Sequence, residues 1–159
     1  MPFTTFLLVI HILGAIAIFG VTFAYPFIGA MARKEGAPIA WALELIDFLE
    51  NKWVVPLALT LQPASGALLI VHNHFDPFKA QHRWLLAGII IYIVAIGYAI
   101  FVQGRIGKKA HHMAVANQFG PEFGALMKKL QMGGQFLTVL LIAIVILMVI
   151  KPGSGYIHT

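Results

Sequence analysis

The residue with the clearest chemical potential is His11, which lies inside a long apolar segment. The segment from Phe3 to Ala32 contains no Asp, Glu, Lys or Arg. At 1.5 Å per residue of helix, His11 is roughly 12 Å deep in that segment. Ionisable side chains at such depth are costly and usually face protein or a cavity. The imidazole is therefore either hydrogen-bonded to another helix or acts as a ligand or proton carrier.

Other polar residues are expected at the same depth as His11. Gly14, one turn on, would let a neighbouring helix or a flat cofactor approach. If the spans alternate in direction, Gln62, Ser65 and Tyr92 are level with His11, and Gln62, Ser65 and His72 share one helical face. These residues predict a polar cluster, which either lines a cofactor site or only joins helices, at about 0.6 kcal/mol per hydrogen bond.

Further histidines gather on the same side of the predicted membrane. His72, His74 and His82 lie in or beside a short polar loop, with Asp76 among them. Imidazoles are common ligands for haem iron, copper and zinc. His11 with one of His72, His74 or His82 predicts a b-type haem. A copper or zinc site at the loop is the second option.

The elements that must position these residues are four apolar segments, at about 4–30, 53–71, 84–104 and 130–150. Each is long enough to cross a bilayer as a helix of about 20 residues. Short connections predict an all-α, antiparallel bundle of four transmembrane helices, forming one domain over residues 1–159.

Several local features modify the four predicted helices. Residues 38–51 have helical apolar spacing and form either an amphipathic helix at the interface or an extension of the second span. Pro63 is expected to kink the second span and free the carbonyl near Leu59. The third helix is expected to continue into a basic stretch that Phe119-Gly-Pro121 ends, and the last helix to start near Pro121.

The basic residues predict how the chain is oriented. Their formal excess is +5, and eight of eleven fall in the first and third loops: Arg33, Lys34, Lys52, Arg105, Lys108, Lys109, Lys128 and Lys129. By the positive-inside rule these loops are cytoplasmic, and both termini and the second loop are outside. The basic excess predicts contact with the lipid bilayer and its anionic headgroups, not with nucleic acid. The absence of cysteine excludes thiol chemistry.

The opening His11-Ile-Leu-Gly14-Ala15, followed by Phe19-Gly20, resembles the "H-x-x-G-A … G" start of a bacterial superfamily. That superfamily includes copper-resistance protein D-like domains, HemJ-type protoporphyrinogen oxidases and a family of uncharacterised predicted integral membrane proteins. The ending Leu147-Met148-Val-Ile-Lys151-Pro152 is most similar to the uncharacterised family. The resemblance implies a bacterial inner membrane location.

The same resemblance implies haem binding at the position of His11, as in the HemJ-type proteins. Those enzymes carry a functional lysine shortly after a Trp-Leu pair in the third span. Here Trp84-Leu85 is followed by Leu, Ala, Gly and Ile. This difference argues against protoporphyrinogen oxidation, while the copper proteins imply a metal handled at the outer face.

Three functions follow, in this order. The first is a b-type haem protein in electron transfer or haem handling. The second is a cofactor-free accessory subunit that packs in a larger membrane complex or a homo-oligomer, and the third is a copper-handling protein. No paired carboxylates, phosphate loop or nucleophile motif is visible, so the sequence leaves open whether the protein is an enzyme.

Overall fold

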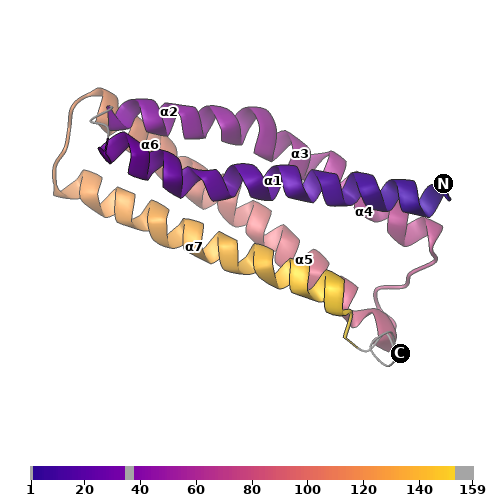
Figure 1. Cartoon of the computed structure of the whole chain (residues 1–159). Helices are drawn as coiled ribbons and strands as arrows, with labels where there is room; N and C mark the ends of the chain where they lie inside the picture. The colour runs from indigo at the N-terminus through magenta and orange to yellow at the C-terminus, as the bar shows by residue number, and fades with distance from the viewer. Residues whose placement is uncertain (1, 35–37, 153–159) are drawn as a thin grey trace.

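The computed structural model describes residues 2–34 and 38–152, which form helices joined by short connections (Figure 1). In chain order they are α1 (Phe3–Lys34), α2 (Ile39–Leu49), η1 (Glu50–Val54), α3 (Val55–Leu59), α4 (Leu61–His72), η2 (Ala80–His82), α5 (Arg83–Tyr98), η3 (Ala99–Gln103), α6 (Gly104–Val115) and α7 (Pro121–Ile150). η1 and η3 are π-helical turns, and η2 is a 3₁₀ turn. The predicted all-α class is confirmed.

Four continuous stretches are long and apolar enough to cross a membrane: Phe3–Ala32, Ile39–His72, Ala80–Val115 and Pro121–Ile150. They run antiparallel, so the molecule has two distinct ends (Figure 1). We call the end with the N-terminus, the α4–α5 connection and the end of α7 the terminal end. The opposite end, where α2 begins and α6 connects to α7, is the basic end.

The helices pack unequally around the bundle. α1 packs along α4 and α2, α7 packs along α5 and α6, and α2 contacts α6. α1 and α7 touch each other only slightly. In Figure 1 the α1–α4 pair and the α5–α7 pair diverge toward the terminal end. The two pairs are therefore held together mainly in the half that contains the basic end.

Residues 39–49 extend the second span as α2 and do not form a separate surface helix. α2 runs directly into η1 and α3, and Leu43 is buried in a cluster with Ala110 and Ala114 of α6. Phe123 and Met127 of α7 pack against the same cluster. Small residues on α6 allow the helices to approach closely, so this end has an apolar core of its own.

The predicted kink at Pro63 is present as an interruption of the helix at Thr60. Proline has no N–H to donate, and its ring displaces the carbonyl four residues earlier, that of Leu59. α3 ends at Leu59, and Thr60 has a non-helical backbone with φ −120° and ψ −76°. The Thr60 hydroxyl donates to the Pro56 carbonyl at 2.6 Å. α4 therefore starts a new helical segment, which carries Gln62 and Ser65.

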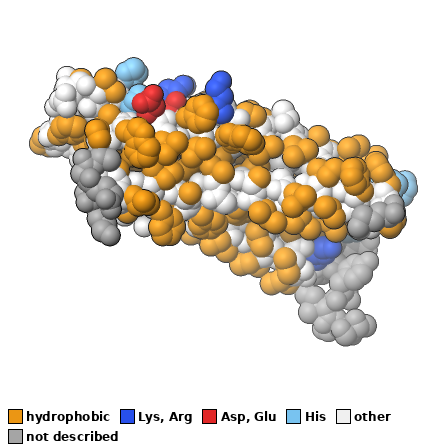
Figure 2. Space-filling view, turned by 45° about the horizontal axis from the view of Figure 1, so that its top comes forward, with side chains coloured by type: hydrophobic (Ala, Val, Ile, Leu, Met, Phe, Trp, Pro, Cys, Tyr) orange, Lys and Arg blue, Asp and Glu red, His pale blue; other side chains and the backbone are white. Residues whose placement is uncertain are grey.

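The level of the hydrocarbon region follows from the apolar part of α7. Leu130 to Ile150 measures about 30 Å at 1.5 Å per residue, the thickness of a bilayer core. The Gln103 amide donates to the Leu130 carbonyl at 3.1 Å, so the end of η3 is at the limit of this region nearer the basic end. Apolar side chains cover most of the face in Figure 2, and charged side chains gather mainly toward the basic end.

Candidate functional site

His11 lies at the contact between α1 and α4, where both ring nitrogens have partners. Its Nδ1 is 2.9 Å from the Ser65 hydroxyl, and its Nε2 is 3.2 Å from the Gln62 amide nitrogen. Ser65 is buried, with 4% of its surface exposed. The structure thus brings together three of the residues that the sequence placed at one depth.

The hydrogen bonds around Ser65 favour one neutral form of the imidazole. The Ser65 hydroxyl donates to the Leu61 carbonyl at 2.7 Å, so its single proton is used there. The hydroxyl oxygen then accepts from Nδ1–H of His11. A neutral ring with a proton on Nδ1 has its lone pair on Nε2, which accepts from the Gln62 amide. Nε2 is the atom that a metal ion would use.

The Gln62 side chain occupies the space beside His11. Its carbonyl oxygen Oε1 is buried and has no hydrogen-bond partner among the described residues. A Cβ added to Gly14 would lie 2.7 Å from that oxygen, and one added to Gly66 would lie 3.2 Å from His11 Cε1. The small residue Gly14 therefore accommodates α4 itself, and a flat group could reach Nε2 only after Gln62 moved.

Tyr92 does not join this cluster. Its hydroxyl donates to the Ala58 carbonyl of α3, one turn from Gln62 toward the basic end. That carbonyl lies beside the helix break, and the bond connects α5 to the second span. Tyr92 was expected at the level of His11, but it binds the backbone one turn nearer the basic end instead of His11.

The three loop histidines have surroundings of their own, and among the described residues the partners of His11 are Ser65 and Gln62. The His72 ring contacts Phe3 edge-on, with centroids 5.1 Å apart, and follows Ser65 by two turns, roughly 10 Å along the axis. His82 Nδ1 is 2.9 Å from the Asp76 carbonyl. His74 is in a left-handed conformation with φ 53°. Within residues 2–34 and 38–152 no three His, Cys, Asp or Glu side chains come together to hold a metal ion.

A second polar site, near the basic end, was not anticipated from the sequence. The Tyr25 hydroxyl donates to Glu50 Oε2 at 2.8 Å, joining α1 to η1. A pocket of about 280 Å³ lies beside Glu50. Its polar lining consists of Asp47, Glu50 and Asn51 from one helix and Arg105 and Lys108 from another. The spacing of Asp47 with Glu50, and of Arg105 with Lys108, was a signal that each pair shares a helical face.

Both π-helical turns adjoin this pocket. The N–H of Val55 donates to the Glu50 carbonyl, and that of Gly104 donates to the Ala99 carbonyl, each five residues back. All four of these residues line the pocket. π-turns inside α-helices are rare and frequent at functional sites. An apolar cluster of Ile18, Val54 and Ala58 separates this site from His11.

Comparison with known proteins gives one family. Residues 5–152 match a family model described as "Predicted integral membrane protein (DUF2269)". No curated protein and no solved structure matches the chain significantly.

Proposed function

The chain belongs to this family of predicted integral membrane proteins, and within that setting we propose that it binds a b-type haem through His11. The haem would serve electron transfer or haem handling, in the half of the membrane nearer the terminal end. A haem iron held by an imidazole supplies one-electron redox chemistry.

One observation carries the proposal, namely that Ser65 holds the His11 ring through Nδ1, the nitrogen opposite the one that would bind iron. Histidines that bind metals almost always donate their other ring N–H to a fixed partner, which sets the tautomer. Here the hydroxyl of Ser65 accepts from Nδ1–H, and Nε2 keeps its lone pair. This is the tautomer that leaves Nε2 able to bind a haem iron.

Gln62 sets the condition for binding. Its amide covers Nε2 at 3.2 Å, while its own carbonyl oxygen is buried and unpartnered. A buried polar atom without a partner costs roughly 1–3 kcal/mol, which lowers the cost of moving this side chain away. Gln62 is thus proposed as a cover that leaves Nε2 when haem enters.

His72, His74 and His82 are not part of this proposed site. His72 is roughly 10 Å further along α4 than Ser65, the residue that contacts His11, so the proposal does not use it. His11 is therefore proposed as the protein's sole axial ligand.

The test is an absorption spectrum of protein purified in detergent from haem-supplemented cells, oxidised and reduced. We expect a Soret band that His11→Ala abolishes. Ser65→Ala should weaken haem affinity about 10- to 100-fold, as happens when a metal-binding histidine loses the hydrogen-bond partner of its other ring nitrogen. Gln62→Ala should raise occupancy because it uncovers Nε2, and His72→Ala is the matched control that leaves the band unchanged.

Colourless wild-type and Gln62→Ala proteins after haem supplementation would refute the proposal. An unchanged Soret band in folded His11→Ala would do the same. Gln62→Ala keeps His11, so the test remains decisive even if His11→Ala does not fold.

A second candidate function is a cofactor-free accessory subunit of a larger membrane complex. The observation in its favour is α7, which buries the smallest share of its apolar length among the four spans. This function predicts colourless protein that co-purifies with a partner in fixed stoichiometry. Copper handling has less support, because the described histidines do not gather into a shared site.

A further inference from the structure

We propose that the pocket between α2–η1 and η3–α6 binds a phospholipid with a zwitterionic, primary-amine headgroup, of the phosphatidylethanolamine type. This inference uses residues different from those of the haem proposal, so either can fail without the other.

The pocket has one acidic wall and one basic wall. Asp47 and Glu50 are three residues apart on the second span, and Arg105 and Lys108 are three residues apart on the third. Within the described chain none of the four is ion-paired across the pocket, whereas Lys109 pairs with Glu122 at 2.6 Å outside it. A ligand with one positive and one negative group, set a few atoms apart, would satisfy both walls.

The chemistry of each wall indicates which group it takes. Arg and Lys bind phosphate through charge-assisted hydrogen bonds. The carboxylates accept hydrogen bonds from an ammonium group, which a primary amine provides and a trimethylated one lacks. Tyr25 holds one Glu50 oxygen at 2.8 Å, which fixes the carboxylate at the pocket wall.

The pocket changes from polar to apolar along the bundle, as a lipid does. Val55 and Phe101 line it on the side toward the membrane centre, and the four charged residues lie toward the basic end. Phe101 is 63% exposed and available to an acyl chain. Phe101 and Gly104 of the pocket flank Gln103 in the chain, so the pocket is level with the Gln103–Leu130 contact, which marks the limit of the hydrocarbon region. Headgroups are found at this level.

The size of the pocket also fits a headgroup. Its volume of about 280 Å³ is just below the roughly 300–1,000 Å³ typical of sites for drug-sized ligands. The π-turns η1 and η3 contribute to its shape, because a residue inserted in a helix rotates the faces on either side.

The experiment measures lipid-dependent thermal stability and bound lipid, by native mass spectrometry, for the full chain in detergent. The added probes are phosphatidylethanolamine, phosphatidylcholine, phosphatidylglycerol and soluble glycerophosphoethanolamine. We expect phosphatidylethanolamine to bind at least about tenfold more tightly than the other lipids, a difference of about 1.4 kcal/mol.

Variants of the charged residues test which part of the lipid each wall of the pocket binds. Asp47→Asn with Glu50→Gln should remove the preference for phosphatidylethanolamine over phosphatidylglycerol, and Arg105→Gln with Lys108→Gln should weaken all three lipids. Lys109→Gln, on the same helix but outside the pocket, is the control that keeps the preference. If the acidic double variant does not fold, Asp47→Asn alone, at an exposed position, should reduce the preference.

Three results would overturn the proposal. The first is equal binding of the three lipids to the wild type. The second is an unchanged preference for phosphatidylethanolamine in the folded acidic variant. The third is stabilisation by soluble glycerophosphoethanolamine as large as that by phosphatidylethanolamine. The last result would assign the pocket to a soluble zwitterion.

Discussion

At the scale of single residues, the polar side chains inside the bundle differ in how many of their hydrogen-bonding atoms have a partner. His11 has a partner at each ring nitrogen, whereas Gln62 and Gln103 each keep a buried carbonyl oxygen without one in the described chain. In a membrane an unsatisfied polar group has no water to bind, so its cost is not relieved. A small movement of either glutamine that gave this oxygen a partner would therefore be favourable.

Gly133 of α7 gives a stability prediction at the same scale. A Cβ there would overlap the Gln103 carboxamide and lie 2.8 Å from the Tyr98 hydroxyl, whereas one at Gly134 would meet nothing within 4 Å. Gly133→Ala should destabilise the protein by about 1–3 kcal/mol through overpacking, measured as a lower Tm in detergent. Gly134→Ala is the matched control, and equal Tm values for the two variants would contradict the close packing.

At the scale of elements, the second span is one long helix with two interruptions, made up of α2, η1, α3 and α4. α2 packs on α6 near the basic end, η1 carries Glu50, and α4 starts afresh after the break at Thr60. A polar site lies next to each interruption. The π-turn η1 adjoins the charged pocket, and the break at Thr60 comes directly before Gln62 and Ser65. The irregular parts of the helix thus coincide with its two polar sites.

The packing of α2 can be tested with two substitutions on that helix. Leu43 is 7% exposed and packs against α6, whereas Phe48 is 53% exposed. Leu43→Ala should cost about 2–5 kcal/mol, as expected for a buried leucine, seen as a clear loss of Tm. Phe48→Ala removes a larger side chain yet should change Tm little. A larger loss of Tm for Phe48→Ala than for Leu43→Ala would contradict the packing of α2 against α6.

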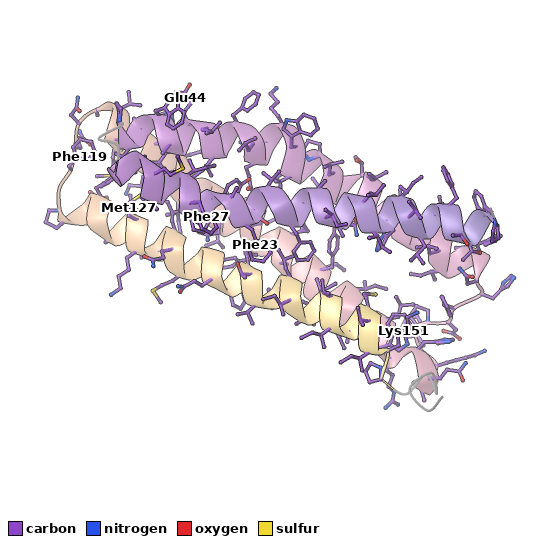
Figure 3. All side chains as sticks on the ribbon, in the orientation of Figure 1. Phe23, Phe27, Glu44, Phe119, Met127 and Lys151 are labelled. Atoms are coloured by element: carbon purple, nitrogen blue, oxygen red, sulfur yellow. The ribbon has the colours of Figure 1, made fainter. Side chains whose placement is uncertain are left out.

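Figure 3 shows Glu44 on α2 and Phe119 and Met127 at the same basic end.

At the scale of the whole molecule, the bundle is asymmetric along its axis. The helices extend past the apolar limit at Gln103 and Leu130, through α6 and the first turns of α7, into a region with its own small core. At the terminal end Lys151 lies over the Trp84 ring, 5.7 Å from its centroid, and so ties α7 to α5 (Figure 3). The charged pocket lies at the junction of the apolar and extended parts.

The orientation of the bundle is a prediction that the absence of cysteine makes simple to test. Eight of the eleven basic residues belong to residues 33–52 and 105–129, in the half of the bundle with the basic end, so this end should face the cytoplasm. Asn117→Cys, between α6 and α7, should react with an impermeant maleimide only after cells are opened. Asp76→Cys, between α4 and α5, should react in intact cells (for a Gram-negative host, after the outer membrane is permeabilised). The reverse pattern would invert the topology.

The sequence alone determined the number of spans, the helix break at Pro63 and the common depth of His11, Gln62 and Ser65. These follow from local rules: charge-free length, the missing proline N–H and the rise per residue, none of which needs a neighbour to be known. Only the tertiary structure decided that Tyr92 binds the Ala58 carbonyl, that α2 continues the second span, and that Asp47 and Glu50 face Arg105 and Lys108. Those facts depend on which face each helix turns toward its neighbours. π-turns change that face, and no residue composition in the sequence predicts where they occur.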